Sequence, residues 1–271
     1  MDDLDTDLNV RRAGLPPGEG PLLVLLHGLT GSGAAWPDAW QHWGSTYSIV
    51  SVDQRGHGTS PRFTSEQLAG HPGEIMVDDA VALLAQLPDR PVVMGHSMGG
   101  AVALAAAVRR PELVRALVLE DPAPISPGED ARDGARGREF AESVQDSRAA
   151  ADEDELLAVR RTQHSDWTDD ELLASGTAEQ QVDLTFLENG EYRPLTPWPD
   201  LFAQVAVPTL VVSGDTVDEI VITAEHERGI AEIGNPRVRL VRVPGSGHCI
   251  RREQPAAYYA AVDAFLADVT R

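Results

Sequence analysis

The chain has 271 residues, and its 43 acidic and 22 basic side chains give a formal net charge of −21. All the basic residues are arginines, so enzymes that depend on a lysine Schiff base, a phosphate-loop lysine or a serine–lysine dyad are excluded. The negative charge disfavours nucleic acid and anionic membranes as partners, and no apolar run is long enough to predict a transmembrane helix.

The first eight residues carry four aspartates and no basic residue, which is unlike a secretion signal. Cys249 is the only cysteine, so the sequence predicts no disulfide within the chain. We therefore expect a cytoplasmic protein, either a monomer or a homodimer, that folds as one large domain.

From residue 21 onwards, short apolar runs alternate with turn signals and helical patterns, as in a parallel sheet covered by helices. Apolar residues at helical spacing predict helices over residues 73–86, 99–108 and 255–269. This alternation predicts an α/β fold with a mostly parallel central sheet and helices on both faces. The predicted strands are Leu22–Leu26, Tyr47–Val52, Pro91–Met94, Ala116–Leu119, Pro208–Ser213 and Val238–Val243.

Residues 124–202 differ from the rest of the chain in having many charges and few β-branched runs. We interpret this stretch as a helical insertion. It divides one core domain into two parts, residues 1–123 and residues 203–271. The helices predicted within the insertion are 139–150, 154–162 and 169–175.

The strongest chemical signal is a Gly-x-Ser-x-Gly sequence, Gly95-His96-Ser97-Met98-Gly99, between an apolar strand and an alanine-rich helix. The two glycines permit a sharp turn that raises the Ser97 hydroxyl above the sheet. The helix that follows presents its N-terminus to developing negative charge. This context predicts that Ser97 is a nucleophile, and a merely structural turn is the alternative.

A nucleophilic serine needs a base, and His248 is the strongest candidate. It lies in a glycine-rich loop, residues 243–249, between the last predicted strand and the last predicted helix. It also follows Ser97 in the chain order serine, acid, histidine that the hydrolase arrangement uses. A histidine that only stabilises the loop is the alternative.

In these motifs the chain resembles the α/β-hydrolase superfamily, over nearly its whole length apart from the insertion. His27-Gly28-Leu29 is similar to the oxyanion-loop motif of that family, and residues 53–60 are similar to its D-x-R-G-x-G-x-S turn. The resemblance implies an α/β-hydrolase fold in which the insertion is a helical lid over the active site. It also implies an oxyanion hole formed by the backbone N–H groups of Leu29 and Met98.

The acid that orients His248 is left open by the sequence. Asp121 follows the strand after the nucleophile helix, where haloalkane dehalogenases and some lactone hydrolases of the superfamily carry their acid. In many other relatives the acid lies three residues after a glycine that ends the penultimate strand, and here a valine occupies that place. Asp218 and Asp215 flank it. Asp121 is the first choice and Asp218 the second, while Asp215 and Glu120 stay as further candidates.

Three tryptophans are candidates for the walls of a substrate pocket. Trp36 follows the oxyanion-loop motif, and Trp167 and Trp198 lie in the predicted lid. Packing in the core or within the lid is the alternative for each of them. Since the sequence has neither a metal-binding motif nor a dinucleotide fingerprint, we expect no metal and no cofactor. Cys249 is expected to be a packing residue.

These residues predict a cofactor-independent serine hydrolase that cleaves a small carboxylic ester or lactone through an acyl-enzyme on Ser97. The resemblance leaves other reactions open, because the superfamily carries C–C bond hydrolysis, acyl transfer and perhydrolysis on the same residues. A slow or non-catalytic ligand receptor is the alternative from a different class of protein. Haloalkane dehalogenases and the family's epoxide hydrolases use an aspartate as nucleophile, so Ser97 argues against both.

Overall fold

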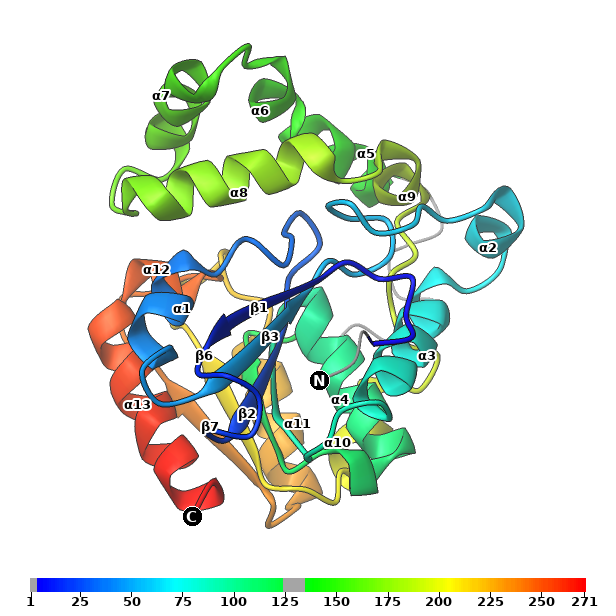
Figure 1. Cartoon of the computed structure of the whole chain (residues 1–271), viewed down its shortest axis with the longest axis vertical. Coiled ribbons are helices and arrows are strands. Elements are labelled where there is room, and N and C mark those ends of the chain that lie inside the picture. Colours follow the sequence, from blue (N-terminus) through cyan, green and yellow to red (C-terminus); the bar gives the residue numbers. More distant parts are fainter. Residues whose placement is uncertain (1–3, 124–134) are drawn as a thin grey trace.

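The computed structural model describes residues 4–123 and 135–271, and their strands form one seven-stranded sheet in the order β1-β3-β2-β4-β5-β6-β7 (Figure 1). β1 is antiparallel to β3, and every other neighbouring pair of strands is parallel. The predicted α/β fold with a mostly parallel sheet is confirmed. The strands are β1 (Val10–Gly14), β2 (Leu22–Leu26), β3 (Ser48–Val52), β4 (Val92–His96), β5 (Ala116–Glu120), β6 (Thr209–Ser213) and β7 (Val238–Arg242).

All six predicted strands form, with ends that differ from the prediction by at most two residues. β1 is the strand that the sequence analysis missed. Its segment, Val-Arg-Arg-Ala-Gly, is half-exposed and has no apolar run, because it pairs on one side only, at the edge of the sheet. The apolar pattern that identified the other six strands, including the second edge strand β7, is therefore absent from β1.

Helices cover both faces of the sheet, because the strands are apolar on both sides. In β2, Val24 and Leu26 pack against one layer of helices, and Leu23 and Leu25 pack against the other. The first layer is α3 (Pro72–Leu84), α4 (Met98–Arg109), α10 (Trp198–Gln204) and α11 (Ala224–Ile233). The second layer is α1 (Pro37–Trp43), α12 (Ile250–Glu253) and α13 (Pro255–Val269).

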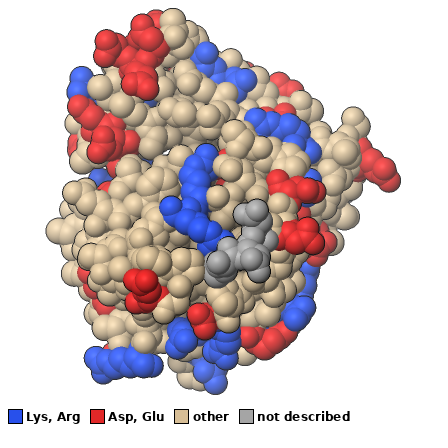
Figure 2. Space-filling view, viewed as in Figure 1, with Lys and Arg blue, Asp and Glu red and all other residues tan. Residues whose placement is uncertain are grey.

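A further group of helices lies above the sheet in Figure 1. These are α5 (Ala135–Ser143), α6 (Gln145–Ala149), α7 (Glu153–Gln163), α8 (Asp169–Gln181) and α9 (Leu184–Asn189). The short α2 (Ser65–Ala69) and the 3₁₀ turn η1 (Pro111–Leu113) complete the described elements. In Figure 2, acidic side chains gather over the upper left of the molecule, where α7 begins with Glu153, Asp154 and Glu155.

Two helix predictions in the insertion need correction. The single helix expected over residues 139–150 is two helices, α5 and α6, separated at Val144, and α8 continues six residues beyond its predicted end at Ser175. Residues 124–134 of the predicted lid lie outside the described part of the chain. Its other predicted boundary, after residue 202, falls within α10, which packs against α4 and α11. The division into core and lid stays a prediction.

No helix among the described residues is long and apolar enough to cross a membrane.

Candidate active site

Ser97 occupies a strained turn between β4 and α4. Its backbone has φ +52° and ψ −118°, a left-handed conformation that is rare for a residue with a side chain. The two motif glycines are required because backbone atoms of other residues lie where a Cβ atom would be. A Cβ atom at Gly95 would lie 2.3 Å from the Gly99 carbonyl oxygen, and one at Gly99 would lie 2.2 Å from the carbonyl oxygen of Leu26. The structure therefore forms the turn that the sequence predicts, at the carboxyl end of β4.

The ring of His248 is hydrogen-bonded to Asp121. His248 Nδ1 lies 2.7 Å from Asp121 Oδ2, across 127 residues of sequence. Asp121 directly follows β5, has φ +36°, and is completely buried. Because a carboxylate at Nδ1 fixes which ring nitrogen carries the proton, Nε2 of His248 is left as the proton acceptor.

Three further donors hold the Asp121 carboxylate in place. The Val221 N–H donates to Oδ2 at 2.8 Å, the Ile222 N–H donates to Oδ1 at 2.9 Å, and the Ser213 hydroxyl donates to Oδ1 at 3.4 Å. All three donors come from the end of β6 and the loop after it. The carboxylate is thus paired and oriented before any substrate binds.

The other carboxylates considered from the sequence lie elsewhere. Asp215 accepts a hydrogen bond from the Gly245 N–H at 2.7 Å. Glu120 accepts one from the Arg251 N–H at 2.8 Å. Asp218 has φ +74° in the loop after β6. Among the described residues, Asp121 is the only carboxylate that contacts the His248 ring.

Ser97 and His248 line the same cavity, which has a volume of about 240 Å³. No hydrogen bond joins the Ser97 hydroxyl to the His248 ring, a contact that often tightens only in the complex with substrate. The side chain of His96 contacts His248. Its Nε2–H donates to the His248 carbonyl at 3.1 Å, and the two rings lie 4.6 Å apart. Burial and the nearby His248 lower the pKa of His96 well below its usual value, so this donor is a neutral ring.

The loop that carries Leu29 is braced by two buried histidines. His27 donates from Nδ1 to the Gly28 carbonyl and accepts at Nε2 from the Gln54 N–H, at 2.8 and 3.0 Å. Burial lowers the pKa of His27 to about 3, so its ring is neutral. His57 Nε2–H donates to the Leu29 carbonyl at 2.7 Å. The D-x-R-G-x-G-x-S turn and the oxyanion loop thus position each other.

The N–H groups of Leu29 and Met98 make no hydrogen bond to another described residue. Met98 is the first residue of α4, where N–H groups have no partner within the helix. Gly28 approaches the serine turn closely, since a Cβ there would lie 2.8 Å from His96 Nδ1 and 3.3 Å from Ser97 Cβ. This approach brings the Leu29 loop beside Ser97.

Of the three predicted pocket tryptophans, Trp36 lines the cavity. Trp167 does not line it but lies under the Arg252 guanidinium, whose central carbon is 4.6 Å from the ring centre. Trp198 does not line this cavity. It packs against Phe202 and His226 and belongs to a separate small pocket.

The charged part of the cavity wall was not predicted from the sequence. Arg251 and Arg252 in α12 and Glu120 at the end of β5 line one part of the cavity, and Arg160 and Glu179 line it from α7 and α8. Burial raises the pKa of Glu120 to about 8. The available signal was the pair Arg251-Arg252, which follows His248 by three residues and which no motif uses.

Cys249 also lines the cavity, next to His248. Burial raises the pKa of its thiol to about 12, so the thiolate needed for nucleophilic or redox chemistry is disfavoured. This agrees with the packing role expected from the sequence. Among the described residues, no group of three or more His, Cys, Asp or Glu side chains could hold a metal ion.

Comparison with known proteins identifies the family. Residues 23–262 match the model of the "Alpha/beta hydrolase family". Lipase LipV of Mycobacterium tuberculosis is 35% identical over 210 residues, which are 74% of each protein. The sn-1-specific diacylglycerol lipase of Mus musculus is 28% identical over 260 residues, 91% of this chain and 81% of the relative.

The solved structure of an enol-lactonase from Burkholderia xenovorans has the same fold, with a TM-score of 0.73, 22% identity, and 96% of both chains covered. The relatives named here are hydrolases of lipids or lactones. The strained serine turn, the buried Asp121–His248 pair and the family match agree, and this chain belongs to the α/β-hydrolase family.

Proposed function

We propose that this chain is a serine hydrolase that cleaves a small carboxylic ester or lactone through an acyl-enzyme on Ser97. The observation that carries the proposal is the 2.7 Å contact between His248 Nδ1 and the buried Asp121 carboxylate, in a cavity that also exposes Ser97. A base oriented in this way beside a serine on a strained turn is the arrangement that activates a hydroxyl for acyl transfer.

In the first half of the reaction, the Ser97 hydroxyl oxygen attacks the substrate carbonyl carbon while His248 Nε2 takes the hydroxyl proton. Asp121 stabilises the imidazolium and holds its Nδ1–H. The unpaired N–H groups of Leu29 and Met98 donate to the oxyanion of the tetrahedral intermediate, where each such donor contributes about 3 kcal/mol. The intermediate collapses as His248 returns the proton to the leaving alcohol.

In the second half, water attacks the acyl-enzyme. His248 takes a proton from the water, the same two N–H groups stabilise the second oxyanion, and the carboxylic acid leaves as Ser97 regains its proton. A lactone differs only in that its leaving alcohol stays attached to the acyl group. No cofactor enters either half. The names of the relatives, lipase and enol-lactonase, support ester and lactone substrates.

Intact-mass spectrometry after treatment with a fluorophosphonate tests the nucleophile without knowledge of the substrate. We expect one stoichiometric adduct on the wild-type protein and none on Ser97→Ala. Folded wild-type protein without an adduct would contradict the proposal. Turnover of p-nitrophenyl butanoate that Ser97→Ala lacks would support ester hydrolysis. Tight binding of the same ester without turnover would favour the receptor alternative.

A further inference from the structure

The cavity wall has a charge opposite to that of the protein. The chain carries a net charge of −21, yet three of its 22 arginines, Arg160, Arg251 and Arg252, line the cavity that contains Ser97. Two glutamates also line it, Glu120 and Glu179. Because burial raises the pKa of Glu120 to about 8, its carboxyl is largely protonated at neutral pH. The residues that line the cavity thus carry more positive than negative charge, and Glu171 and Asp38, which lie outside the wall, pair with Arg251 and Arg252.

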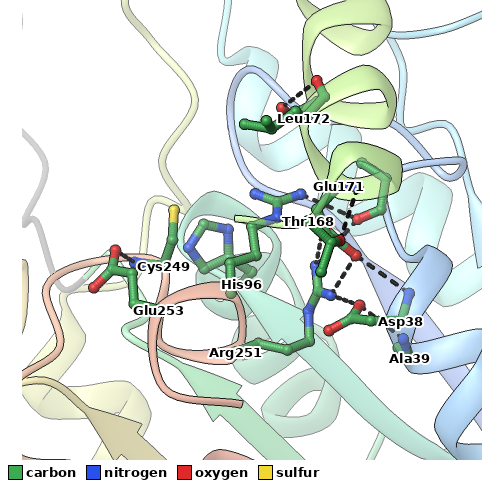
Figure 3. A network of polar contacts seen from close by, with 12 residues as sticks. Asp38, Ala39, His96, Thr168, Glu171, Leu172, Cys249, Arg251 and Glu253 are labelled. Atoms are coloured by element: carbon green, nitrogen blue, oxygen red, sulfur yellow. Dashed lines mark hydrogen bonds and ion pairs between the residues drawn. The ribbon is translucent and has the colours of Figure 1, made fainter. Parts of the chain in front are cut away.

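Carboxylates of the protein neutralise the positive charge of Arg251. It donates from Nη1 to Glu171 at 2.9 Å and from Nη2 to the Ala35 carbonyl at 3.2 Å, and it pairs with Asp38. Figure 3 shows Arg251 reaching towards Glu171 and Asp38. These two carboxylates are not part of the cavity wall. Arg251 thus serves the contact between α12, α8 and α1.

Arg252 is held equally firmly but keeps one end free. Its Nε–H donates to Glu171 Oε2 at 2.6 Å and its Nη2 to the Ala35 carbonyl at 3.1 Å, and its plane lies over Trp167. No oxygen or nitrogen atom of a described residue accepts from Nη1, while the Cys249 thiol is a further hydrogen-bond partner of the side chain. Because Arg252 lines the cavity, Nη1 is the part of this guanidinium that can donate to a carboxylate there.

Arg160 lies beside the same indole ring, with its central carbon 6.0 Å from the Trp167 ring centre. It pairs with Glu179 at 2.8 Å and donates to the Ser175 hydroxyl at 3.3 Å. Arg160 is only 4% exposed, and its Nε–H, like that of Arg251, is buried and has no hydrogen-bond partner. Arg160 thus adds a second guanidinium to the part of the cavity wall beside Arg252.

We infer that the substrate carries a free carboxylate in addition to its ester or lactone carbonyl, and that Arg252, with Arg160 beside it, binds this carboxylate. The inference rests on the proposed function, because it assigns a substrate class to the same cavity. Arg252 is a specificity residue in this assignment: it touches the substrate away from the reacting carbonyl.

A matched pair of esters tests the inference. Mono-p-nitrophenyl glutarate carries a terminal carboxylate, and the p-nitrophenyl ester of glutaramic acid carries a neutral amide of nearly the same shape. We expect wild-type kcat/KM to favour the anionic ester by about tenfold or more, and Arg252→Gln to reduce the ratio towards one. For each ester, the rate of hydrolysis with Ser97→Ala is subtracted from the rate with wild type. This background includes intramolecular attack by the carboxylate of the anionic ester.

The matched control is Arg161→Gln, which removes the arginine next to Arg160 in α7. Arg161 pairs with Asp169 at 2.7 Å on the surface and does not line the cavity, so the preference should persist. Because the ratio of two substrates is measured on one preparation, it does not depend on the fraction of folded protein. If Arg252→Gln does not fold, Arg252→Lys keeps the charge without the fork and should lower the ratio partly.

Competitive inhibition measures carboxylate binding without an ester bond. It therefore also covers a substrate whose carboxylate lies in the alcohol part and not in the acyl part. Glutarate should inhibit hydrolysis of the neutral ester about tenfold more strongly than glutaramide, and Arg252→Gln should remove this difference. Ser97-dependent hydrolysis with no preference in either experiment would overturn the inference and leave the proposed function intact. Turnover that survives Ser97→Ala would instead contradict the proposed function.

Discussion

The floor and the roof of the cavity are built in different ways. The floor consists of the loops at the carboxyl ends of the strands, which carry Ser97, Asp121 and His248. It depends on unusual backbone angles at Ser97 and Asp121 and on glycines that no other residue can replace. The roof consists of α5, α7 and α8, which contribute the ion pair of Arg160 with Glu179 and the uncharged side chains of Phe140 and Ser175 to the cavity wall.

This difference separates the groups of the proposed reaction from those of the proposed recognition. In the floor, short segments of backbone set the positions of the groups that the proposed acyl transfer needs, within a few residues of each strand end. In the roof and at its contact with α12, side chains far apart in the sequence determine which charges face the cavity. Changes to the floor should therefore abolish turnover or folding, and changes to the roof should alter stability and selectivity.

The largest effect is expected from Asp121→Asn. The substitution keeps the size of the side chain but favours the wrong tautomer of His248, so kcat should fall by about 10⁴-fold. Steady-state kinetics with an activated ester would measure it. Asp218→Asn is the control and should remain close to wild type. The opposite pattern would assign the acid to Asp218.

Gly99→Ala tests the steric basis of the floor. The added Cβ would lie 2.2 Å from the Leu26 carbonyl oxygen, so we expect a loss of about 3 kcal/mol or more in the free energy of unfolding. At Gly70, in contrast, the nearest atom to an added Cβ is 3.5 Å away. Gly70→Ala should change stability by less than about 1 kcal/mol. Equal urea midpoints for the two variants would refute this account.

Glu171→Gln tests the attachment of the roof to the core. Glu171 is 2% exposed and pairs with both Arg251 and Arg252, so its loss leaves Arg252 without a counter-charge and Arg251 with Asp38 alone. We expect a destabilisation of about 3 kcal/mol in urea denaturation. Asp169→Asn in the same helix removes the exposed pair with Arg161 and should cost less than about 0.5 kcal/mol.

The smallest effect concerns the pH dependence of stability through Glu120. Burial raises its pKa in the folded protein to about 8, above the ordinary value of 4.5. The folded state therefore binds the proton more tightly, and this contribution to stability is complete below pH 4.5 and lost as the pH rises through 8.

Glu120→Gln imitates the protonated acid and should remove that loss. The difference in melting temperature between the variant and the wild type should increase from pH 6 to pH 9. The increase should be about 2–4 °C for each kcal/mol that the wild type loses. Thermal unfolding followed by circular dichroism at several pH values would measure it. Parallel curves for the two proteins would contradict the buried, protonated state of Glu120.

The sequence by itself determined the parts of this protein that depend on local physics. The six predicted strands, the Ser97 turn and the glycine-rich loop of His248 follow from apolar runs and from glycines at fixed spacing, because backbone sterics act within a few residues. The edge strand β1 escaped prediction, since its pairing with β3 is a tertiary contact that its own composition does not reflect.

Only the tertiary structure decided which carboxylate contacts His248. Asp121, Asp215 and Asp218 all follow strands, and the choice depends on how the ends of β5 and β6 lie against the loop that carries His248, which is 127 residues from Asp121 in the sequence. The same holds for Arg252, which meets Glu171 across 81 residues. Side-chain contacts between distant segments depend on the packing of whole elements, and no local pattern specifies that packing.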